Sequence, residues 1–274
     1  MNQIKTNHLK RVLIIAGSDC SGGAGIQADL KTLSYFGVYG MTAITALTAQ
    51  NTLGVHQVEN LPIDFVQKQI DVCISDIGVD AIKIGMVHKA EIFDAIYDSF
   101  VKFDIINNKK IKIVFDPVMF AKGGYPLLES DAILALKKFV RKCNPIITPN
   151  IPETELLSKT KVKNEKDMIF SGEKILKMGA EAVILKGGHL EKLDLTDYVL
   201  TKKGFLKLVS KKINTKNTHG TGCTLASAIA ANLAKSFSLK KSMKLAHTYV
   251  LNGIKYAPNF GKGHGPLNHY FRLN

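Results

Sequence analysis

The sequence predicts an α/β fold in which a mainly parallel sheet carries helices on both of its faces. Two observations predict this fold. Short runs rich in Ile, Val and Ala alternate along the chain with longer amphipathic segments, as strands and helices alternate in such proteins. Several short runs are apolar without interruption, for example V-L-I-I-A at 12–16, and such strands are typical of parallel sheets covered on both sides.

Each expected strand is an apolar or β-branched run that ends at a turn residue. The first run ends at Gly17, and a later one ends at Asp116-Pro117, where the proline fixes the turn. The last two strands are joined around Lys203-Gly204 and are expected to form a hairpin. The expected strands cover 11–16, 41–49, 55–61, 81–84, 111–115, 146–148, 182–185, 198–201 and 205–210.

Each expected helix is a longer segment bounded by start and stop residues. Gly37 ends the first helix, Pro62 and Asp64 begin the second, and the helix after residue 220 is rich in alanine, which predicts tight packing. The expected helices cover 26–36, 62–77, 90–103, 131–143, 153–157, 165–178, 221–235 and 239–256. No linker, low-complexity segment or repeat interrupts them, which predicts a single domain over 1–274 with a flexible extension at 1–10.

The composition is that of a globular, intracellular protein. Hydrophobic residues make up 46% of the chain, enough for a buried core, and no run of about 18 uncharged apolar residues is present, so no membrane span is expected. The N-terminus lacks the apolar stretch of a secretion signal. The four cysteines are scattered without C-x-x-C spacing, which predicts free thiols and a cytoplasmic location.

The formal charge of +14 does not by itself predict nucleic-acid binding. Only three of the 37 basic residues are arginine, and the lysines are dispersed in pairs such as Lys109-Lys110. Base-reading and stacking contacts favour arginine and aromatic side chains, whereas dispersed lysine is typical of a solvated surface. Nucleic acid is therefore not an expected partner, although weak attraction to polyanions, including nucleotides, is.

The segment N-T-K-N-T-H-G-T-G-C at 214–223 predicts a phosphate site. Gly220 and Gly222 allow a tight turn close to a ligand, and the small-residue helix that follows directs unpaired N–H groups and its positive dipole end into that turn. Cys223 lies at the mouth of the turn, where a thiol can be partly ionised. The alternative is a glycine-rich connection with a buried cysteine.

The glycine-rich loop after the first strand, G-S-D-C-S-G-G-A-G, matches neither common nucleotide motif. Gly17 and Gly22 have the spacing of a P-loop, but Gly23-Ala24 replaces its Lys-Ser/Thr, and the dinucleotide spacing G-x-G-x-x-G is absent. The loop is expected to bring backbone close to another kind of ligand. Asp29, in the following helix, is either a ligand contact or a charge that favours the helix dipole.

Two carboxylates at strand ends are candidates for a Mg²⁺ site. Asp116 follows a buried strand, and Glu153 in T-P-N-I-P-E lies at the edge of the next one, where both can orient the ion beside a phosphate. The alternatives are a turn residue and a charge at a helix N-terminus. Lys186, at a strand end, can contact a nucleotide phosphate, and Lys122 in A-K-G-G-Y is either on a loop that closes over phosphates or simply exposed.

Gln50 ends an apolar strand and offers a paired donor and acceptor, which suits recognition of a planar heterocycle. Met86 is expected beside it as an apolar wall, or otherwise as a core residue. His189 and His219 occur in loops where most histidines only form hydrogen bonds or face solvent. Because ligands of such sheets bind beyond the carboxyl ends of the strands, where nearly all these segments lie, one shared site is expected.

Taken in order, these segments closely resemble the hydroxymethylpyrimidine/phosphomethylpyrimidine kinases of thiamine biosynthesis, in the ribokinase-like superfamily. The matching stretches are A-G-S-D-x-S-G-G-A-G-I-Q-A-D-L-K-T, I-T-A-L-T-A-Q-N-T, K-I-G-M, D-P-V-M-x-A-K, I-T-P-N-x-P-E, L-K-G-G-H and N-T-K-N-T-H-G-T-G-C-T. Each is weak alone, but the set is specific and covers nearly the whole chain. The resemblance implies a ribokinase-like three-layer α/β sandwich without a separate lid domain, assembled as a homodimer.

The resemblance also implies roles for individual residues. Gly220, Gly222 and Cys223 should form the anion hole for the transferred phosphoryl group, with Lys122 on a flap over it. The other implied contacts are Gln50, Asp29, Met86, Val118 and Gly17 for the aminopyrimidine, Lys186, Thr218 and His219 for ATP, and Asp116 and Glu153 for Mg²⁺.

The implied reaction has two steps at one site. ATP phosphorylates the hydroxymethyl group of 4-amino-5-hydroxymethyl-2-methylpyrimidine, and a second ATP then phosphorylates the monophosphate. Related sugar kinases have an aspartate base where Cys223 stands in this chain. Cys223 is therefore either a thiolate base, which only the alcohol step needs, or a polar contact in the anion hole, which both steps share.

Two alternative functions remain open. Some pyridoxine/pyridoxal kinases of the same branch share the S-G-G-A-G loop and the G-x-G-C turn, but Gln50 in A-Q-N-T favours the pyrimidine. A non-enzymatic, polyanion-binding protein is the more distant alternative. Its binding would fall steeply with salt, and it would turn over no ATP.

Overall fold

The structure, a computed structural model, describes residues 9–121, 124–129, 132–187 and 194–271. Lys122, His189 and most of the extension expected at 1–10 lie outside these ranges. What the sequence predicts for them stays a prediction.

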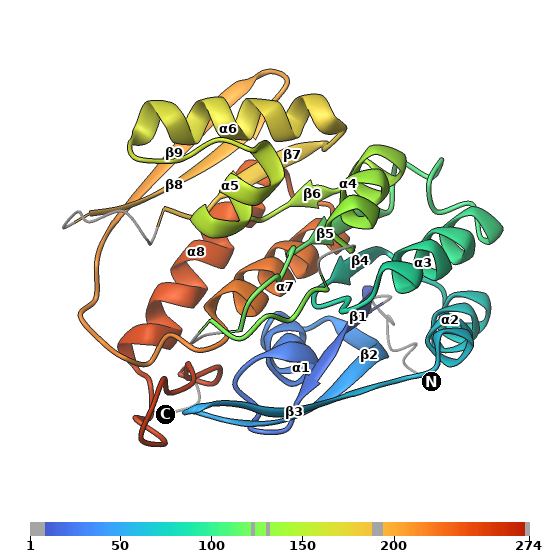
Figure 1. Ribbon diagram of the computed structural model, residues 1–274, viewed down its shortest axis with the longest axis horizontal. Coiled ribbons are helices and arrows are strands. Elements are labelled where there is room, and N and C mark those ends of the chain that lie inside the picture. The colour runs from blue at the N-terminus through green and yellow to red at the C-terminus, as the bar shows by residue number, and fades with distance from the viewer. Residues whose placement is uncertain (1–8, 122–123, 130–131, 188–193, 272–274) are drawn as a thin grey trace, which may run out of the picture.

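The centre of the fold is a nine-stranded sheet (Figure 1). Its strands are β1 (Arg11–Asp19), β2 (Tyr39–Asn51), β3 (Gly54–Asn60), β4 (Ala81–Ile84), β5 (Lys112–Phe115), β6 (Ile146–Ile147), β7 (Ala182–Leu185), β8 (Asp194–Thr201) and β9 (Gly204–Lys211). Their order across the sheet is β3-β2-β1-β4-β5-β6-β7-β8-β9. The strands from β2 to β7 in this order are parallel, and antiparallel pairing is confined to β3 at one edge and to β8 and β9 at the other.

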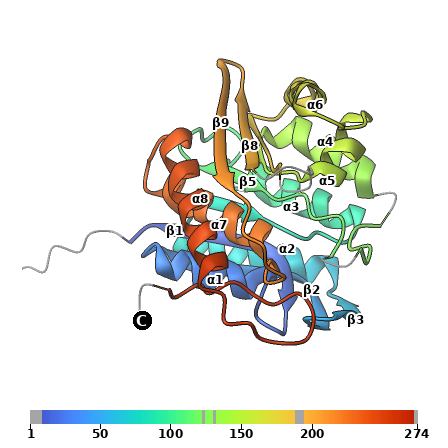
Figure 2. The same cartoon turned by 90° about the vertical axis from the view of Figure 1, so that its left-hand side faces the viewer.

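Helices cover both faces of this sheet. They are α1 (Gly25–Tyr35), α2 (Ile63–Val72), α3 (Ala90–Lys102), α4 (Ala132–Cys143), α5 (Ile151–Ser158), α6 (Glu165–Met178), α7 (Thr221–Ala234) and α8 (Leu239–Lys255). Figure 2 shows α1, α7 and α8 on one face and α2 to α6 on the other. No helix within the described ranges combines the length and apolarity needed to cross a membrane.

Alternation along the strands divides the core into two halves. In β1, Leu13 and Ile15 pack with α2 to α6. The residues that alternate with them, Val12, Ile14 and Ala16, pack with α1 and α7. The half around α7 is built largely from small side chains, because α7 is buried from Thr224 to Ala234 and is rich in alanine. Small side chains let α7 approach the sheet closely. A Cβ on Gly222, in its first turn, would lie only 3.1 Å from Oδ2 of Asp116, which directly follows β5.

The predicted fold class is confirmed, and the differences are local. β4, α6 and β7 have the predicted bounds. β1 runs beyond its predicted end to Asp19, because Ser18 and Asp19 still pair with β2 after a bulge. The second helix changes to a π-helix over Cys73–Ile77 and stops at Gly78, which has a φ of 76°. The single domain over 1–274 stays a prediction.

Candidate active site

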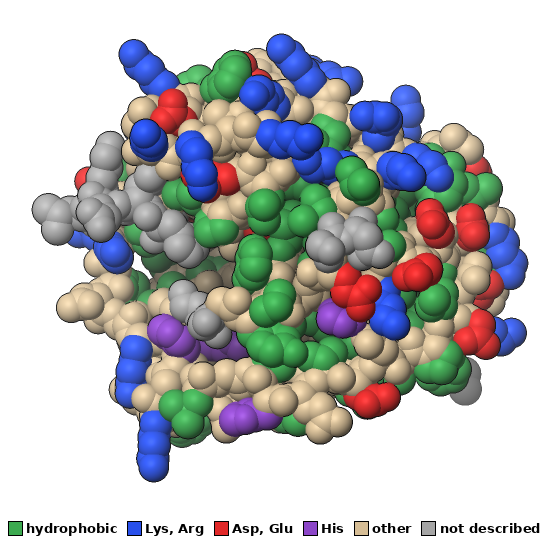
Figure 3. Space-filling view, in the orientation of Figure 1, with side chains coloured by type: hydrophobic (Ala, Val, Ile, Leu, Met, Phe, Trp, Pro, Cys, Tyr) green, Lys and Arg blue, Asp and Glu red, His purple; other side chains and the backbone are tan. Residues whose placement is uncertain are grey.

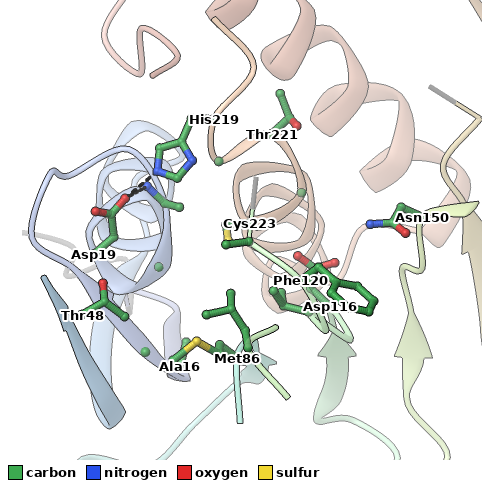
Figure 4. Close-up of a pocket in the computed structure, with 18 of the residues that line it drawn as sticks. Ala16, Asp19, Thr48, Met86, Asp116, Phe120, Asn150, His219, Thr221 and Cys223 are labelled. Carbon is green, nitrogen blue, oxygen red and sulfur yellow. Dashed lines mark hydrogen bonds and ion pairs between the residues drawn. The ribbon is translucent and has the colours of Figure 1, made fainter. Parts of the chain in front are cut away.

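A cavity of about 560 Å³ lies at the carboxyl ends of the central strands, beside the N-terminus of α7. Figure 3 shows a hollow beside histidine side chains, with lysine and arginine side chains mainly around the periphery. Figure 4 shows two opposed sides of the cavity: Ala16 and Met86 lie on one, Asp116 and Asn150 lie on the other, and Cys223 lies between them. We call these the β1–β2 side and the β5–β7 side.

Most of the residues predicted for the site border this one cavity. They are Gly17, Gln50, Met86, Asp116, Val118, Glu153, Lys186, Thr218, His219, Gly220, Gly222 and Cys223. The shared location at the carboxyl ends of parallel strands explains why segments so far apart in the sequence meet there.

The two glycine-rich segments of the site pack directly against each other. A Cβ on Gly220, where φ is +80°, would lie 1.8 Å from the backbone oxygen of Gly23. A Cβ on Gly23 would lie 2.4 Å from the ring of His219, and one on Gly25 would lie 2.5 Å from the backbone oxygen of Gly17. Only residues without a side chain allow this approach, which brings the N-terminus of α7 against the loop after β1.

Asp19 ties these two segments together from the side. Its carboxylate accepts hydrogen bonds from the N–H and hydroxyl of Ser21 at 2.8 and 2.7 Å and from the N–H of Ala24 at 2.7 Å. Nε2 of His219 donates to it at 2.8 Å, and Gln50 also hydrogen-bonds it. Burial alone would raise the pKa of Asp19, but these hydrogen bonds hold it well below its ordinary value, so the carboxylate is ionised.

The N-terminus of α7 presents backbone donors to the cavity. Gly220 is its N-cap residue, and no side chain caps the helix. The N–H groups of Gly222 and Cys223 are in the first turn, where an α-helix provides no acceptor for them, and both residues border the cavity. A phosphate group fits these donors and the positive end of the helix dipole.

Cys223 is a thiol at neutral pH. Burial raises its pKa to about 12, although the ammonium of Lys83 and the N–H of Gly25 act in the opposite direction. Burial thus outweighs the effect of Lys83 and of the N–H of Gly25 on the thiol. Of the two interpretations of Cys223, the thiolate base is disfavoured and the polar contact in an anion hole is favoured.

Opposite charges gather on the β5–β7 side. Nζ of Lys186 lies 2.9 Å from Oδ1 of Asp116, which also accepts a hydrogen bond from the hydroxyl of Thr148 at 2.9 Å. Burial would lower the pKa of Lys186, but Asp116 and Glu153 raise it to about 12, so Lys186 is a cation. Glu153 forms a capping box with Asn150 at the start of α5, and burial raises its pKa to about 7 even though Lys186 opposes the shift.

These carboxylates fit a partial Mg²⁺ site. Among the residues that the structure describes, no group of three His, Cys, Asp or Glu side chains is arranged to hold a metal ion alone. Mg²⁺ at phosphate-binding sites, however, takes one or two carboxylates together with phosphate oxygens and waters. Asp116 and Glu153 border the same side of the cavity and supply such a pair, and Oδ2 of Asp116 faces Gly222 in the anion-binding turn.

The structure corrects the prediction that Asp29 lines the ligand pocket. Asp29 is fully buried in α1 and does not border the cavity. Its two oxygens accept hydrogen bonds from Lys83 at 2.7 Å and from Ser227 at 2.6 Å. Both oxygens are therefore committed to partners inside the protein.

Sequence reasoning missed several residues of the cavity wall. Asp19 occurs in the A-G-S-D motif, and its signal is a carboxylate close behind an apolar strand. Lys83 has a clearer signal, because it stands between Ile82 and Ile84 in a strand that is buried along its whole length. The other unpredicted residues include Ala16, Thr48 and Phe120.

Comparison with known proteins identifies the family. The model of the family described as phosphomethylpyrimidine kinase matches residues 19–268, which is most of the chain. The chain belongs to the phosphomethylpyrimidine kinase family. The hydroxymethylpyrimidine/phosphomethylpyrimidine kinase of Bacillus subtilis is 41% identical over 266 residues that cover 96% of each chain.

A longer relative and two solved structures agree with this assignment. The thiamine biosynthesis bifunctional protein ThiED of Geobacter sulfurreducens is 44% identical over 94% of this chain, and the chain spans about half (52%) of that protein. An ADP complex of Bacillus subtilis pyridoxal kinase has a TM-score of 0.86 at 34% identity, covering 97% of this chain and 100% of that chain. Phosphomethylpyrimidine kinase from Clostridium difficile has a TM-score of 0.76 at 42% identity, covering 88% of this chain and 98% of that one. The ribokinase-like fold implied by the resemblance is confirmed.

The contact between the two glycine segments predicts a specific sensitivity at Gly220. Gly220→Ala places a methyl group on a residue with positive φ and also against the backbone of Gly23. Gly37→Ala also places a methyl group on a residue with positive φ, +62°, but no atom lies nearby. We expect Gly37→Ala to lose about 1 kcal/mol of unfolding free energy and Gly220→Ala to lose a further ~1–3 kcal/mol, measured by urea denaturation.

Kinase activity gives a second measurement of the same contact. A displaced α7 misaligns the anion site, so Gly220→Ala should lower the initial rate about 100-fold while Gly37→Ala leaves it nearly unchanged. Equal stability and activity in the two variants would show that neither property depends on the close contact between Gly220 and Gly23.

Proposed function

We propose that this chain is an ATP-dependent kinase that phosphorylates 4-amino-5-hydroxymethyl-2-methylpyrimidine and then its monophosphate. Membership of the phosphomethylpyrimidine kinase family supports this function, and so does the naming of the Bacillus subtilis relative. The observation that carries the proposal is the cavity itself, in which Gln50 and Met86 lie in the same space as the N-terminal turn of α7.

The pyrimidine is proposed to bind on the β1–β2 side. Gln50 offers a donor and an acceptor to the ring, and Met86 and Val118 supply apolar contacts. Gly17 leaves room for Met86, since a Cβ there would lie 2.4 Å from the methyl carbon of Met86. The hydroxymethyl group would then point toward Cys223, which lies between the two sides.

The phosphates of ATP are proposed to bind between the turn of α7 and the β5–β7 side. Gly220, Gly222 and Cys223 would surround the transferred phosphoryl group, because backbone donors held in place stabilise charge that develops during transfer. Lys186, Thr218 and His219 also border the cavity and are the proposed ATP contacts. Lys122 is retained as the proposed flap residue on the strength of the resemblance alone.

Asp116 and Glu153 are the proposed Mg²⁺ ligands. When bound, Mg²⁺ would neutralise phosphate charge during the transfer. A cation beside Glu153 favours its ionised form, so a carboxyl group with a pKa of about 7 would release a proton as the ion binds.

The cellular setting and the assembly are also proposals. The four cysteines are free thiols, which fits a reducing compartment where ATP is abundant, and we propose the cytoplasm. The homodimer rests on the family resemblance alone.

The proposed function is tested by ADP release from purified protein with ATP and Mg²⁺. We expect turnover with the hydroxymethylpyrimidine and with its monophosphate, and little with pyridoxine. Turnover with pyridoxine alone would assign a vitamin B6 kinase. Salt-sensitive ATP binding without turnover of any of these three compounds would indicate the polyanion-binding alternative.

Gln50→Leu should raise the KM for the pyrimidine about 10- to 100-fold, because the ring loses a paired hydrogen-bonding partner. The KM for ATP should change by less than about twofold, since Gln50 lies on the opposite side of the cavity from Lys186. Steady-state kinetics with each substrate varied in turn gives both values. Gln57→Leu, at an exposed position of β3, is the matched control, and an unaltered pyrimidine KM in Gln50→Leu would remove this residue from the pocket.

Cys223→Ala should slow both phosphorylation steps by a similar factor of roughly tenfold, because a thiol with a pKa of about 12 contributes contacts rather than a base. Single-turnover rates with the alcohol and with the monophosphate separate the steps. Cys73→Ala, outside the cavity, is the control. A loss confined to the alcohol step would restore Cys223 as the base.

A further inference from the structure

Lys83 and Asp29 form an ion pair wholly inside the protein. Nζ of Lys83 lies 2.7 Å from Oδ2 of Asp29, and both side chains are 0% exposed. Ser227 donates to the other carboxylate oxygen at 2.6 Å. The three residues come from β4, α1 and α7, and so the pair joins the elements that carry the cavity wall.

The surroundings of this pair make it unusual. In β4, Ile82 and Ile84 pack against α2 to α6, whereas Lys83 reaches toward α1 and α7. That half of the core consists mainly of alanine and aliphatic side chains. Apolar residues of similar volume are often as stabilising as a buried ion pair, or more so, and stability alone therefore does not account for this one.

The pair is oriented with respect to the cavity. Lys83 borders the cavity and Asp29 does not, so the positive end of the pair is the end nearer to the cavity, although its side chain is 0% exposed. A Cβ on Gly85 would lie 2.7 Å from Nζ of Lys83 and 3.0 Å from Cβ of Ala16, which places the ammonium just behind the β1–β2 wall. Burial opposes the charge of Lys83, but Asp29 and Asp116 together with other nearby groups raise its pKa, so the cation persists at neutral pH.

The two proposed acceptors differ mainly in charge. The alcohol is neutral, whereas a phosphate monoester carries about −1.5 to −2 charges at pH 7. Asp116 and Glu153 repel the second acceptor, and Lys186 is already engaged by Asp116. A further positive group near the acceptor would offset this repulsion, and Lys83 is such a group, although Asp29 pairs with it as Asp116 pairs with Lys186.

We infer that Lys83 is a positioning residue for the phosphate group of the second acceptor, and that its buried ammonium lets one cavity accept a neutral alcohol and then its anionic monophosphate. The inference rests on the proposed two-step function. Such a charge acts across a water-poor region, where electrostatic interactions are stronger and less screened by salt than at the surface. Asp29 and Ser227 hold the ammonium in place, as preorganised electrostatic stabilisation requires.

The double variant Lys83→Met/Asp29→Asn tests this role. It removes both charges, nearly conserves volume and leaves an acceptor for Ser227. The readout is the ratio of the Kd values for the alcohol and the monophosphate, measured by calorimetry without ATP. We expect the affinity for the monophosphate to fall about tenfold and the affinity for the alcohol to change less than about twofold, since only the monophosphate is charged.

Matched controls separate charge from packing. Lys112→Met/Glu181→Gln removes a pair of the same length, 2.7 Å, at the start of β5 and should leave the ratio unchanged. Lys83→Gln, which keeps a donor for Asp29 but removes the cation, is the second variant, and it replaces the double variant if thermal unfolding shows that the latter does not fold.

Equal losses for both ligands, or an unchanged ratio in a folded variant, would overturn the role of Lys83. The binding ratio does not require turnover, and the two proposals can therefore fail separately. If the wild-type protein releases no ADP but its preference for the monophosphate depends on Lys83, the two-step function fails and the site for the phosphate stands.

Discussion

The site depends on one backbone contact, between the loop after β1 and the turn before α7. At Gly23 and Gly220 the two segments approach until no side-chain atom fits between them, and the hydrogen bond from His219 to Asp19 closes the contact from the side. The contact fixes where the N–H groups of α7 point. Because these donors and the helix dipole act over only the first turn, the anion site and the heterocycle side adjoin only while this contact holds.

Around this contact, ion pairs and raised pKa values limit the number of unpaired charges in the protein without a ligand. Lys186 is paired with Asp116, and Lys83 with Asp29. Burial keeps Cys223 protonated and raises the pKa of Glu153 to about 7, which limits the negative charge of the β5–β7 side. An unpaired charge at such depth would be costly. When a cation and an anionic ligand bind together, the cation can interact with the carboxylates of these pairs and the ligand with their lysines. A buried site can bind strongly charged molecules in this way.

The fold was predictable because its signals are local, namely apolar runs and the glycines and prolines that end them. The location of the site followed from topology, since parallel strands end at the same edge. What the sequence left undecided concerns quantities that depend on partners distant in sequence. Asp29 is 54 residues from Lys83, and helix periodicity places Asp29 on the buried face with Ile26 and Leu33 but does not identify its partner. The ionisation of Cys223 depends on its depth, and the end of β1 at Asp19 depends on pairing with β2.

Similarity of fold does not decide between a pyrimidine and a pyridoxal substrate. The TM-score is higher for the Bacillus subtilis pyridoxal kinase, 0.86, than for the Clostridium difficile phosphomethylpyrimidine kinase, 0.76, although the identities run the other way, 34% against 42%. Both relatives share the fold of this chain, so the fold alone cannot discriminate between the two rings. Discrimination has to come from side chains on the β1–β2 side, where a polar group that meets no partner on the wrong ring opposes its binding. Gln50, which borders the cavity on that side, is the residue proposed to impose that difference.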